Sequence, residues 1–238
     1  MIVSCLGWLA TEFLPRFDAA PDTPDNSLMP SALRILITAG PTREPIDEVR
    51  YISNRSSGKM GAALAEAATR AGHQVTLILG PVSVPIPVNI RRMDLETAAE
   101  MHVAVLREFP NHDVLIMAAA VADFRPRFVR SGKVEREGTL AIEFEPTVDI
   151  IAAASQIKRP DQRTVGFSLE SKNNLDRAKQ KMLRKGIDLM VYNPTRTMDS
   201  PTIESVLLYP DGRVEELPCR DKADFADILI ERVTALFR

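Results

Sequence analysis

The chain has 238 residues, of which 45% are hydrophobic and 26% charged, and its formal net charge is -2. This length allows one large domain or two small ones with a sizeable core. The near-neutral charge gives no reason to expect a nucleic-acid partner or a basic membrane-binding surface. Two cysteines and three histidines, with no CxxC pair and no ligand spacing, argue against a disulfide scaffold and a zinc cluster. Because the net charge is close to zero, any anion-binding site must be formed by a local group of residues.

The first 30 residues differ in composition from the rest. Residues 1–10 are apolar, but they are too few to cross a bilayer and lack the basic start of a secretory signal. The Asp- and Pro-rich segment DAAPDTPDNSLMP that follows is typical of a linker. We expect a poorly ordered extension over residues 1–30, with a docked amphipathic helix as the alternative. A single domain over 31–238 and a cytoplasmic location are expected as well.

Strands and helices alternate along most of the remaining chain. In the first half, hydrophobic spacing predicts a strand at 32–40, a helix at 57–71, a strand at 73–80, a helix at 94–109 capped by Asp94, and a strand at 112–123 that runs into a small-residue loop. Residues 124–138 have no clear periodicity and predict a long, mobile loop.

The second half continues the same alternation. It predicts a strand at 140–147, a helix at 148–156, a strand at 163–170, a helix at 173–186, a strand at 188–193, a hairpin at 205–217 around an Asp-Gly turn, and a closing helix at 221–237. The pattern favours a Rossmann-like α/β fold, a doubly wound and mostly parallel sheet with helices on both faces. The hairpin would form an antiparallel edge.

The segment GPTREPIDEVRYISNRSSGKMG (40–61) suggests a nucleotide loop but matches no standard fingerprint. It lacks the G-x-G-x-x-G turn, and the strand at 73–80 ends without the carboxylate that an NAD site needs. It also lacks the first glycine and the Ser/Thr of a P-loop. Ser57, Gly58 and Lys59 nevertheless stand at a helix start, where free N–H groups and the helix dipole favour phosphate. A plain serine-capped helix is the alternative.

The same segment resembles the signature of phosphopantothenoylcysteine synthetase, usually the C-terminal half of a bifunctional bacterial coenzyme A biosynthesis protein. Further motifs of that family follow in order: AAAVADFRP (118–126), Lys133 ten residues after Asp123, PTVDI (146–150), VGFSLE (165–170), and K-x-x-x-K-x-x-D (181–188) followed by Asn193. The resemblance covers about residues 31–238.

The resemblance implies a ligase reaction in which 4'-phosphopantothenate attacks the α-phosphate of CTP. An acyl-cytidylate forms, and L-cysteine then displaces CMP. It also implies Mg²⁺ with the triphosphate, although the metal contacts are unknown. The expected partners are a second copy of the chain, with sites at the subunit interface, and a separate flavin-dependent decarboxylase. No nucleic acid or membrane partner is expected.

The resemblance also assigns roles to residues. Asn54 and Lys133 would be catalytic, Asn54 as a donor to a developing oxyanion and Lys133 on a loop that closes over the intermediate. Asn54, Ala119 and Ala120 would bind the acyl substrate. The nucleotide would be bound by Gly40, Ser57, Gly58, Lys59, Met117, Ala118, Ala119, Asp123, Lys133, Val148, Asp149, Ile150, Ile151, Phe167, Lys181 and Lys185.

Two departures from the family pattern concern loop geometry. Lys133 is followed by Val-Glu-Arg rather than more lysines, and Val148 replaces a proline.

Two other functions stay open at this point: an NAD(P)-dependent reductase on the same fold, which the missing fingerprint disfavours, and a nucleotide-binding module without catalysis, which Asn54 and Lys133 argue against.

Overall fold

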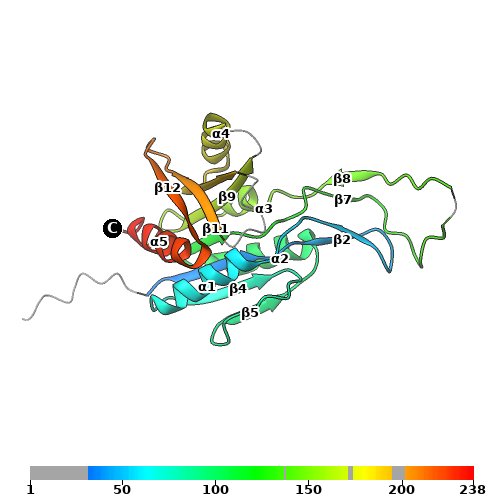
Figure 1. Ribbon diagram of the computed structural model, residues 1–238, viewed down its shortest axis with the longest axis horizontal. Coiled ribbons are helices and arrows are strands. Elements are labelled where there is room, and N and C mark those ends of the chain that lie inside the picture. Colours follow the sequence, from blue (N-terminus) through cyan, green and yellow to red (C-terminus); the bar gives the residue numbers. More distant parts are fainter. Residues whose placement is uncertain (1–31, 137, 171–173, 195–201) are drawn as a thin grey trace, which may run out of the picture.

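The computed structural model describes residues 32–136, 138–170, 174–194 and 202–238 (Figure 1), so the expected extension over 1–30 lies outside the described residues. An eight-stranded sheet forms its centre, in the order β12-β11-β10-β9-β6-β1-β4-β5. The strands are β1 (Arg34–Ala39), β4 (Gln74–Leu79), β5 (Arg91–Asp94), β6 (Val114–Met117), β9 (Arg163–Glu170), β10 (Leu189–Pro194), β11 (Thr202–Leu208) and β12 (Val214–Asp221).

Pairing within the sheet confirms the predicted fold class. All neighbours from β5 to β10 run parallel, whereas β11 and β12 pair antiparallel at the opposite edge. The central strands are runs of apolar residues because both faces of the sheet are covered. β1, for example, has five successive buried residues.

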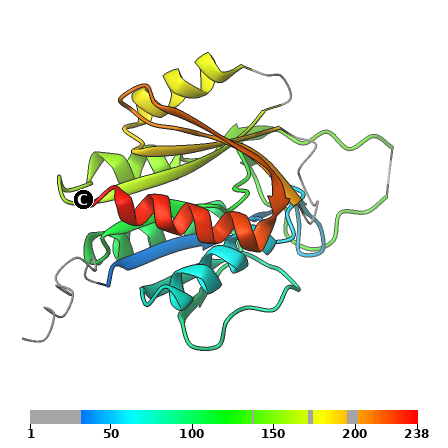
Figure 2. The ribbon, with the colours of Figure 1, turned by 60° about the vertical axis from the view of Figure 1, so that its left-hand side comes forward.

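Helices cover the two faces in separate groups (Figure 2). On one face, α1 (Lys59–Arg70) and α5 (Lys222–Ala235) lie side by side, and on the other lie α2 (Ala98–Glu108), α3 (Ile150–Gln156) and α4 (Leu175–Lys185). A short 3-10 turn, η2 (Phe109–Asn111), follows α2. Each group buries its own hydrophobic cluster against the sheet.

One glycine sets how closely α1 approaches the sheet. A Cβ atom at Gly61 would overlap the Cβ of Ala39 in β1. The absence of a side chain therefore lets the first turn of α1 lie directly against the end of β1.

Two segments expected to be loops contain short hairpins. Within residues 40–58, β2 (Arg43–Pro45) pairs with β3 (Tyr51–Ser53), and β7 (Phe124–Pro126) pairs with β8 (Phe144–Pro146). The second pair forms the base of a long arm that projects from the body, residues 124–136 and 138–146 (Figure 1). The prediction of one loop over 124–138 was therefore wrong at its start, and the strand expected at 140–147 is shorter and outside the main sheet.

The helix expected at 94–109 was also placed too early. Asp94 ends β5, and α2 begins only at Ala98. Thr97 caps it: its side chain accepts from the Glu100 N–H at 3.2 Å, while the Glu100 carboxylate accepts from the Thr97 N–H at 2.9 Å. This capping box bonds N–H groups at the start of α2. Because the helix begins after Thr97, residues 91–94 can pair with β4 as the edge strand β5.

Candidate functional site

The site lies where the chain reverses its direction of winding across the sheet. β1 leads through α1 to β4 on one side, whereas β6 lies on the other side of β1. The loops that leave the carboxyl ends of β1 and β6 therefore diverge there, which in open α/β sheets creates a ligand crevice. The two loops are bonded at their start, with the Ala120 N–H donating to the Gly40 carbonyl at 2.8 Å.

Thr42 holds the long loop after β1 in place. Its buried hydroxyl accepts from the Ala122 N–H at 3.0 Å, and its carbonyl accepts from the Ser53 hydroxyl at 2.7 Å. Glu44, also buried, accepts from the Ala98 N–H at 2.8 Å and ties β2 to the start of α2. The loop is long because it makes a hairpin before it returns to α1.

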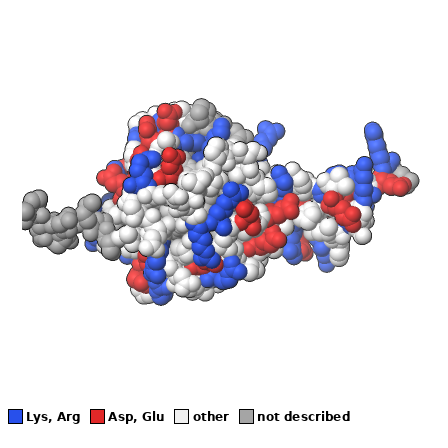
Figure 3. All heavy atoms as spheres, turned by 90° about the horizontal axis from the view of Figure 1, so that it is seen from below, with Lys and Arg blue, Asp and Glu red and all other residues white. Residues whose placement is uncertain are grey.

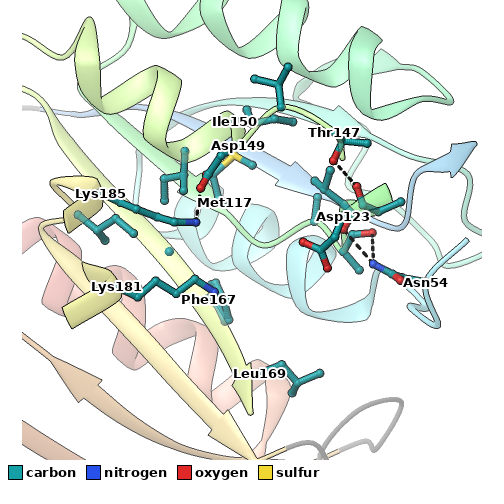
Figure 4. Close-up of a pocket in the computed structure, with 18 of the residues that line it drawn as sticks. Asn54, Met117, Asp123, Thr147, Asp149, Ile150, Phe167, Leu169, Lys181 and Lys185 are labelled. Atoms are coloured by element: carbon teal, nitrogen blue, oxygen red, sulfur yellow. Dashed lines mark hydrogen bonds and ion pairs between the residues drawn. The ribbon is translucent and has the colours of Figure 1, made fainter. Parts of the chain in front are cut away.

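A cavity of about 820 Å³ opens at this edge (Figure 4). Its volume is in the range typical of sites for drug-sized ligands. Twelve of the sequence-predicted site residues line it: Asn54, Met117, Ala119, Ala120, Asp123, Val148, Asp149, Ile150, Ile151, Phe167, Lys181 and Lys185.

Asn54 enters the cavity from the end of the β2–β3 hairpin. Its amide Nδ2 donates to the Val121 carbonyl at 2.9 Å and lies 3.5 Å from the Ala120 carbonyl (Figure 4). These contacts join the loop after β1 to the loop after β6. The side chain is thus held beside the backbone of Ala120 and Val121.

Asp123 lines the same side of the cavity and is exposed. Its position follows from pairing with the segment after β8: the Thr147 N–H donates to the Asp123 carbonyl at 2.9 Å, and the Thr147 hydroxyl donates to the Ala122 carbonyl at 2.6 Å. The backbone that carries this carboxylate is therefore held by two hydrogen bonds from Thr147.

The opposite wall carries the positive charge. Lys181 and Lys185 lie one turn apart on α4, and the Lys185 Nζ is 2.6 Å from the Asp149 carboxylate, which also caps α3 (Figure 4). Two lysines at this spacing repel each other, and Asp149 offsets the charge of one. The floor between the walls is apolar: Gly166 has no side chain, so Ile151 and Ile187 pack directly on the β9 backbone.

A second, smaller cavity of about 120 Å³ lies at the start of α1 and is lined by Ser57, Gly58, Lys59 and Ala118. Gly58 is the N-cap, with φ 77°, and it makes no side-chain cap bond; the Ser56 hydroxyl accepts only from the Gly58 N–H itself, at 3.4 Å. The serine-capped alternative is therefore wrong. A helix start without a side-chain cap leaves donors available to an anion.

Two predicted residues lie outside both cavities. Gly40 directly follows β1 and lies against Val82. Lys133 lies in the arm, and the residues on either side of it bind the β2–β3 turn: the Gly132 N–H donates to Glu48 at 2.9 Å and the Val134 N–H to Asp47 at 3.1 Å. Within one chain, the structure does not bring Lys133 to the cavity.

In the four described ranges, no cluster of three or more His, Cys, Asp or Glu side chains is placed to hold a metal ion. The same part of the chain has no helix that is both long and apolar enough to cross a bilayer.

Comparison with known proteins identifies the family. Residues 31–236 match the family described as the DNA/pantothenate metabolism flavoprotein C-terminal domain. The chain belongs to this family. The resemblance to phosphopantothenoylcysteine synthetase inferred from the motifs is thereby confirmed.

Members of the DNA/pantothenate metabolism flavoprotein family include long bifunctional proteins. The chain is 45% identical to the coenzyme A biosynthesis bifunctional protein CoaBC of Vibrio cholerae over 67% of this chain and 41% of that protein. It is 40% identical to the CoaBC protein of Escherichia coli K12 over 86% and 52%. The chain thus spans about half the length of these relatives.

A solved structure shows the same fold. The crystal structure of the C-terminal domain of a CoaBC protein superposes with a TM-score of 0.75 at 37% identity, covering 86% of this chain and 95% of that domain. In the present chain, three further residues support the site that the sequence analysis did not single out: Thr147 lines the large cavity, Lys222 lines the cavity at α1, and Thr42 bonds the loop after β6. Thr42 and Thr147 belong to quoted motifs, but no local pattern shows that their hydroxyls bond the other loop.

Proposed function

We propose that this chain is a ligase that joins 4'-phosphopantothenate to L-cysteine in coenzyme A biosynthesis and converts CTP to CMP and pyrophosphate. One observation carries the proposal. The cavity of about 820 Å³ gathers Asn54, Asp123, Phe167 and the α4 lysines from separate segments, all of them matching motifs of the synthetase family. Homology to the synthetase half of CoaBC supports it.

In the first step, a carboxylate oxygen of 4'-phosphopantothenate attacks the α-phosphorus of CTP. The bond from that phosphorus to the bridging oxygen breaks, and pyrophosphate leaves. Both reactants are anionic, so positive charge and N–H donors must offset their repulsion. Lys181, Lys185 and the uncapped start of α1 supply them from two sides.

In the second step, the amine nitrogen of L-cysteine attacks the acyl carbon. The bond from that carbon to the phosphate oxygen breaks, CMP leaves, and the amine proton passes to solvent. Negative charge develops on the acyl oxygen, and Asn54 places a neutral side-chain donor beside the Ala120 backbone. We assign it to this oxyanion, because a side-chain amide does not act as an acid or a base at neutral pH but can donate a hydrogen bond.

Mg²⁺ keeps several waters and is usually held by one or two carboxylates together with substrate phosphates. Asp123, an exposed carboxylate in the cavity, is the side chain suited to reach such an ion. When bound, the ion would neutralise phosphate charge.

The proposed assembly is a homodimer that contacts a flavin-dependent decarboxylase. The family resemblance links the synthetase to this second enzyme. The arm supports self-association, because it exposes the apolar side chains of Phe124, Phe128, Val129, Leu140 and Phe144. A second copy could bring Lys133 to the cavity that its own chain does not reach. Figure 3 shows acidic and basic side chains alternating along the same arm.

The test is pyrophosphate release by the purified protein with Mg²⁺ and 4'-phosphopantothenate, comparing CTP with ATP and with or without L-cysteine. We expect CTP-dependent release, with phosphopantothenoylcysteine formed only when cysteine is present. Asn54→Ala should still release pyrophosphate but complete the product about 10²–10³-fold more slowly. No release with either nucleotide would refute the ligase assignment and favour a binding module.

A further inference from the structure

A third cavity lies between the large cavity and the start of α1. It measures about 120 Å³ and shares Phe167 and Leu169 with the large cavity, and Met60, Ala118 and Lys222 with the cavity at α1. This volume holds a few water-sized groups and is far too small for a nucleotide. The third cavity therefore suits a small ligand that reacts with a group bound in the adjacent large cavity.

Asn193 lines this cavity, and its side chain has an acceptor with no hydrogen-bond partner in the part of the chain that the structure describes. The residue is only 4% exposed, and its Nδ2 donates to the Glu204 carbonyl at 3.2 Å. That bond fixes the orientation of the amide, because a carbonyl can only accept. Oδ1 is left buried with no partner. Such an atom normally costs stability, so a ligand N–H or O–H that binds it would recover the loss.

Lys222, the first residue of α5, brings a positive charge to the same cavity, and the remaining wall is largely apolar. A phosphate would use the lysine but offers no donor to Asn193. A sugar hydroxyl would use Asn193 but has no need of the lysine. An α-amino acid uses both, because its ammonium donates and its carboxylate attracts a cation. The apolar side chains, with Phe167 among them, suit a thiol.

We propose that this cavity is the subsite for the amino-acid nucleophile, with Asn193 Oδ1 binding the amine and Lys222 the carboxylate of L-cysteine. The inference rests on the proposed ligase function. Both are positioning residues. A carbonyl that accepts one N–H leaves the nitrogen lone pair available once the ammonium has lost a proton. The amine is then held beside Ala118, two residues from Ala120 at the acyl site.

The test compares L-cysteine with cysteamine, the same aminothiol without its carboxylate, as acceptors in the complete reaction of the full chain. Lys222→Gln should raise the KM for L-cysteine about ten- to hundred-fold, the usual effect of losing a charge-assisted contact. It should leave the KM for cysteamine unchanged. Asn193→Ala should raise both, because both ligands carry the amine.

Ser205→Ala is the matched control. Its hydroxyl is also buried without a partner, but the residue lines none of the three cavities. It should keep the wild-type KM for both amines. Circular dichroism at matched temperature verifies that each variant is folded.

Two results would overturn the subsite while leaving the ligase assignment intact. One is an active wild type whose variants keep the KM for L-cysteine. The other is a Lys222→Gln variant that raises the KM for CTP, or for both amines equally, since Lys222 would then serve the nucleotide or the fold. A wild type that releases no pyrophosphate would refute the proposed function itself.

Discussion

Single residues of the family motifs serve the fold as well as the site, and Asp188 is an example. It ends the motif K-x-x-x-K-x-x-D, yet its Oδ2 accepts from the Lys158 ammonium at 2.6 Å and from the Thr164 N–H at 2.7 Å. Both charged side chains are largely shielded, with relative exposures of 16% for Lys158 and 26% for Asp188. The motif therefore combines site lysines with a structural carboxylate.

Asp188→Ala should lower the free energy of unfolding by about 2–4 kcal/mol, because it leaves a partly buried ammonium without its counterion. Urea denaturation measures the loss. Asp161→Ala is the control, since Asp161 pairs with Arg159 at 3.1 Å but its side chain is 68% exposed. An exposed pair contributes about 0–1 kcal/mol. Equal midpoints for the two variants would contradict this account of Asp188.

His73 gives stability a pH dependence. Its Nδ1 accepts from the Leu33 N–H at 3.2 Å, and its Nε2 lies 3.2 Å from the Thr234 hydroxyl, which donates to Ile230. The ring is therefore neutral, and burial lowers the pKa of His73 below its usual value. The unfolded chain binds a proton at His73 more readily than the folded chain does. The contribution of the neutral His73 ring to the free energy of unfolding is therefore complete above about pH 6.5 and is lost as pH falls through the lowered pKa.

We expect urea midpoints to fall more between pH 7 and pH 5 for the wild type than for His73→Gln, which cannot titrate. His102→Gln, on α2, should keep the wild-type dependence. Parallel pH profiles for the wild type and His73→Gln would show that this histidine does not cause the pH dependence of stability.

At the scale of elements, the sequence predicted those that bury a continuous or periodic apolar face. β1 and β4 each place five successive buried residues in the sheet, and α1 buries one stripe. The missed elements, β2, β3, β5 and β7, have three or four residues and are partly exposed, and β8, of three residues, is shorter than the strand predicted at 140–147. So short a strand has no periodicity of its own and forms because its partner is near.

The residues of the site likewise divide into those that the sequence could place and those that it could not. Motif residues around the large cavity could be placed because they follow the ends of predicted strands. The third cavity could not, because Asn193 in β10 and Lys222 at the start of α5 come together only in the folded chain. The approach of two elements distant in sequence has no local signal.

A buried carboxylate contributes to holding the arm against the β2–β3 turn. Asp47 is buried and accepts from the Arg50 side chain at 2.5 Å and from the N–H groups of Val49, Arg50 and Val134. The Arg50 hydrogen bond and these N–H groups hold the pKa of Asp47 well below its usual range. The attachment therefore depends on a charge that is present at neutral pH and is lost only in strong acid.

Asp47→Asn should loosen the arm at neutral pH, because the amide loses the charge and presents a donor toward Arg50. Amide hydrogen exchange at Val134 should accelerate by about tenfold or more, the equivalent of one or two kcal/mol. Glu143→Gln, in an exposed pair with Arg127 on the same arm, should leave that amide protected. Unchanged exchange in Asp47→Asn would place the attachment elsewhere.

At the scale of the whole molecule, the body and the arm have different surfaces. The body buries two clusters against the sheet, whereas the arm has little to pack on and exposes several large apolar side chains. Close to its base, Tyr51 and Ile52 of β3 are exposed as well. Apolar side chains gathered on a projection are typical of an interface rather than of a monomer surface.

We therefore expect the protein to self-associate through the arm, and Phe128→Asp to separate the copies. Phe128 is 70% exposed, and a buried aromatic anchor at an interface commonly contributes about 2 kcal/mol or more, roughly a thirtyfold change in Kd. Sedimentation velocity over a concentration series measures the shift. Val88→Asp is the control, because Val88 is 90% exposed but lies in the loop before β5. Its Kd should equal that of the wild type.

The same experiment tests why Lys133 lies away from its own cavity. If the arm places it in the site of a second copy, Phe128→Asp should lose ligase activity in proportion to the dimer lost, and activity should return at high protein concentration. Lys133→Gln should remain dimeric but slow at every concentration. A monomeric Phe128→Asp protein with full activity would show that each cavity works without its neighbour, and Lys133 would then need a role within its own chain.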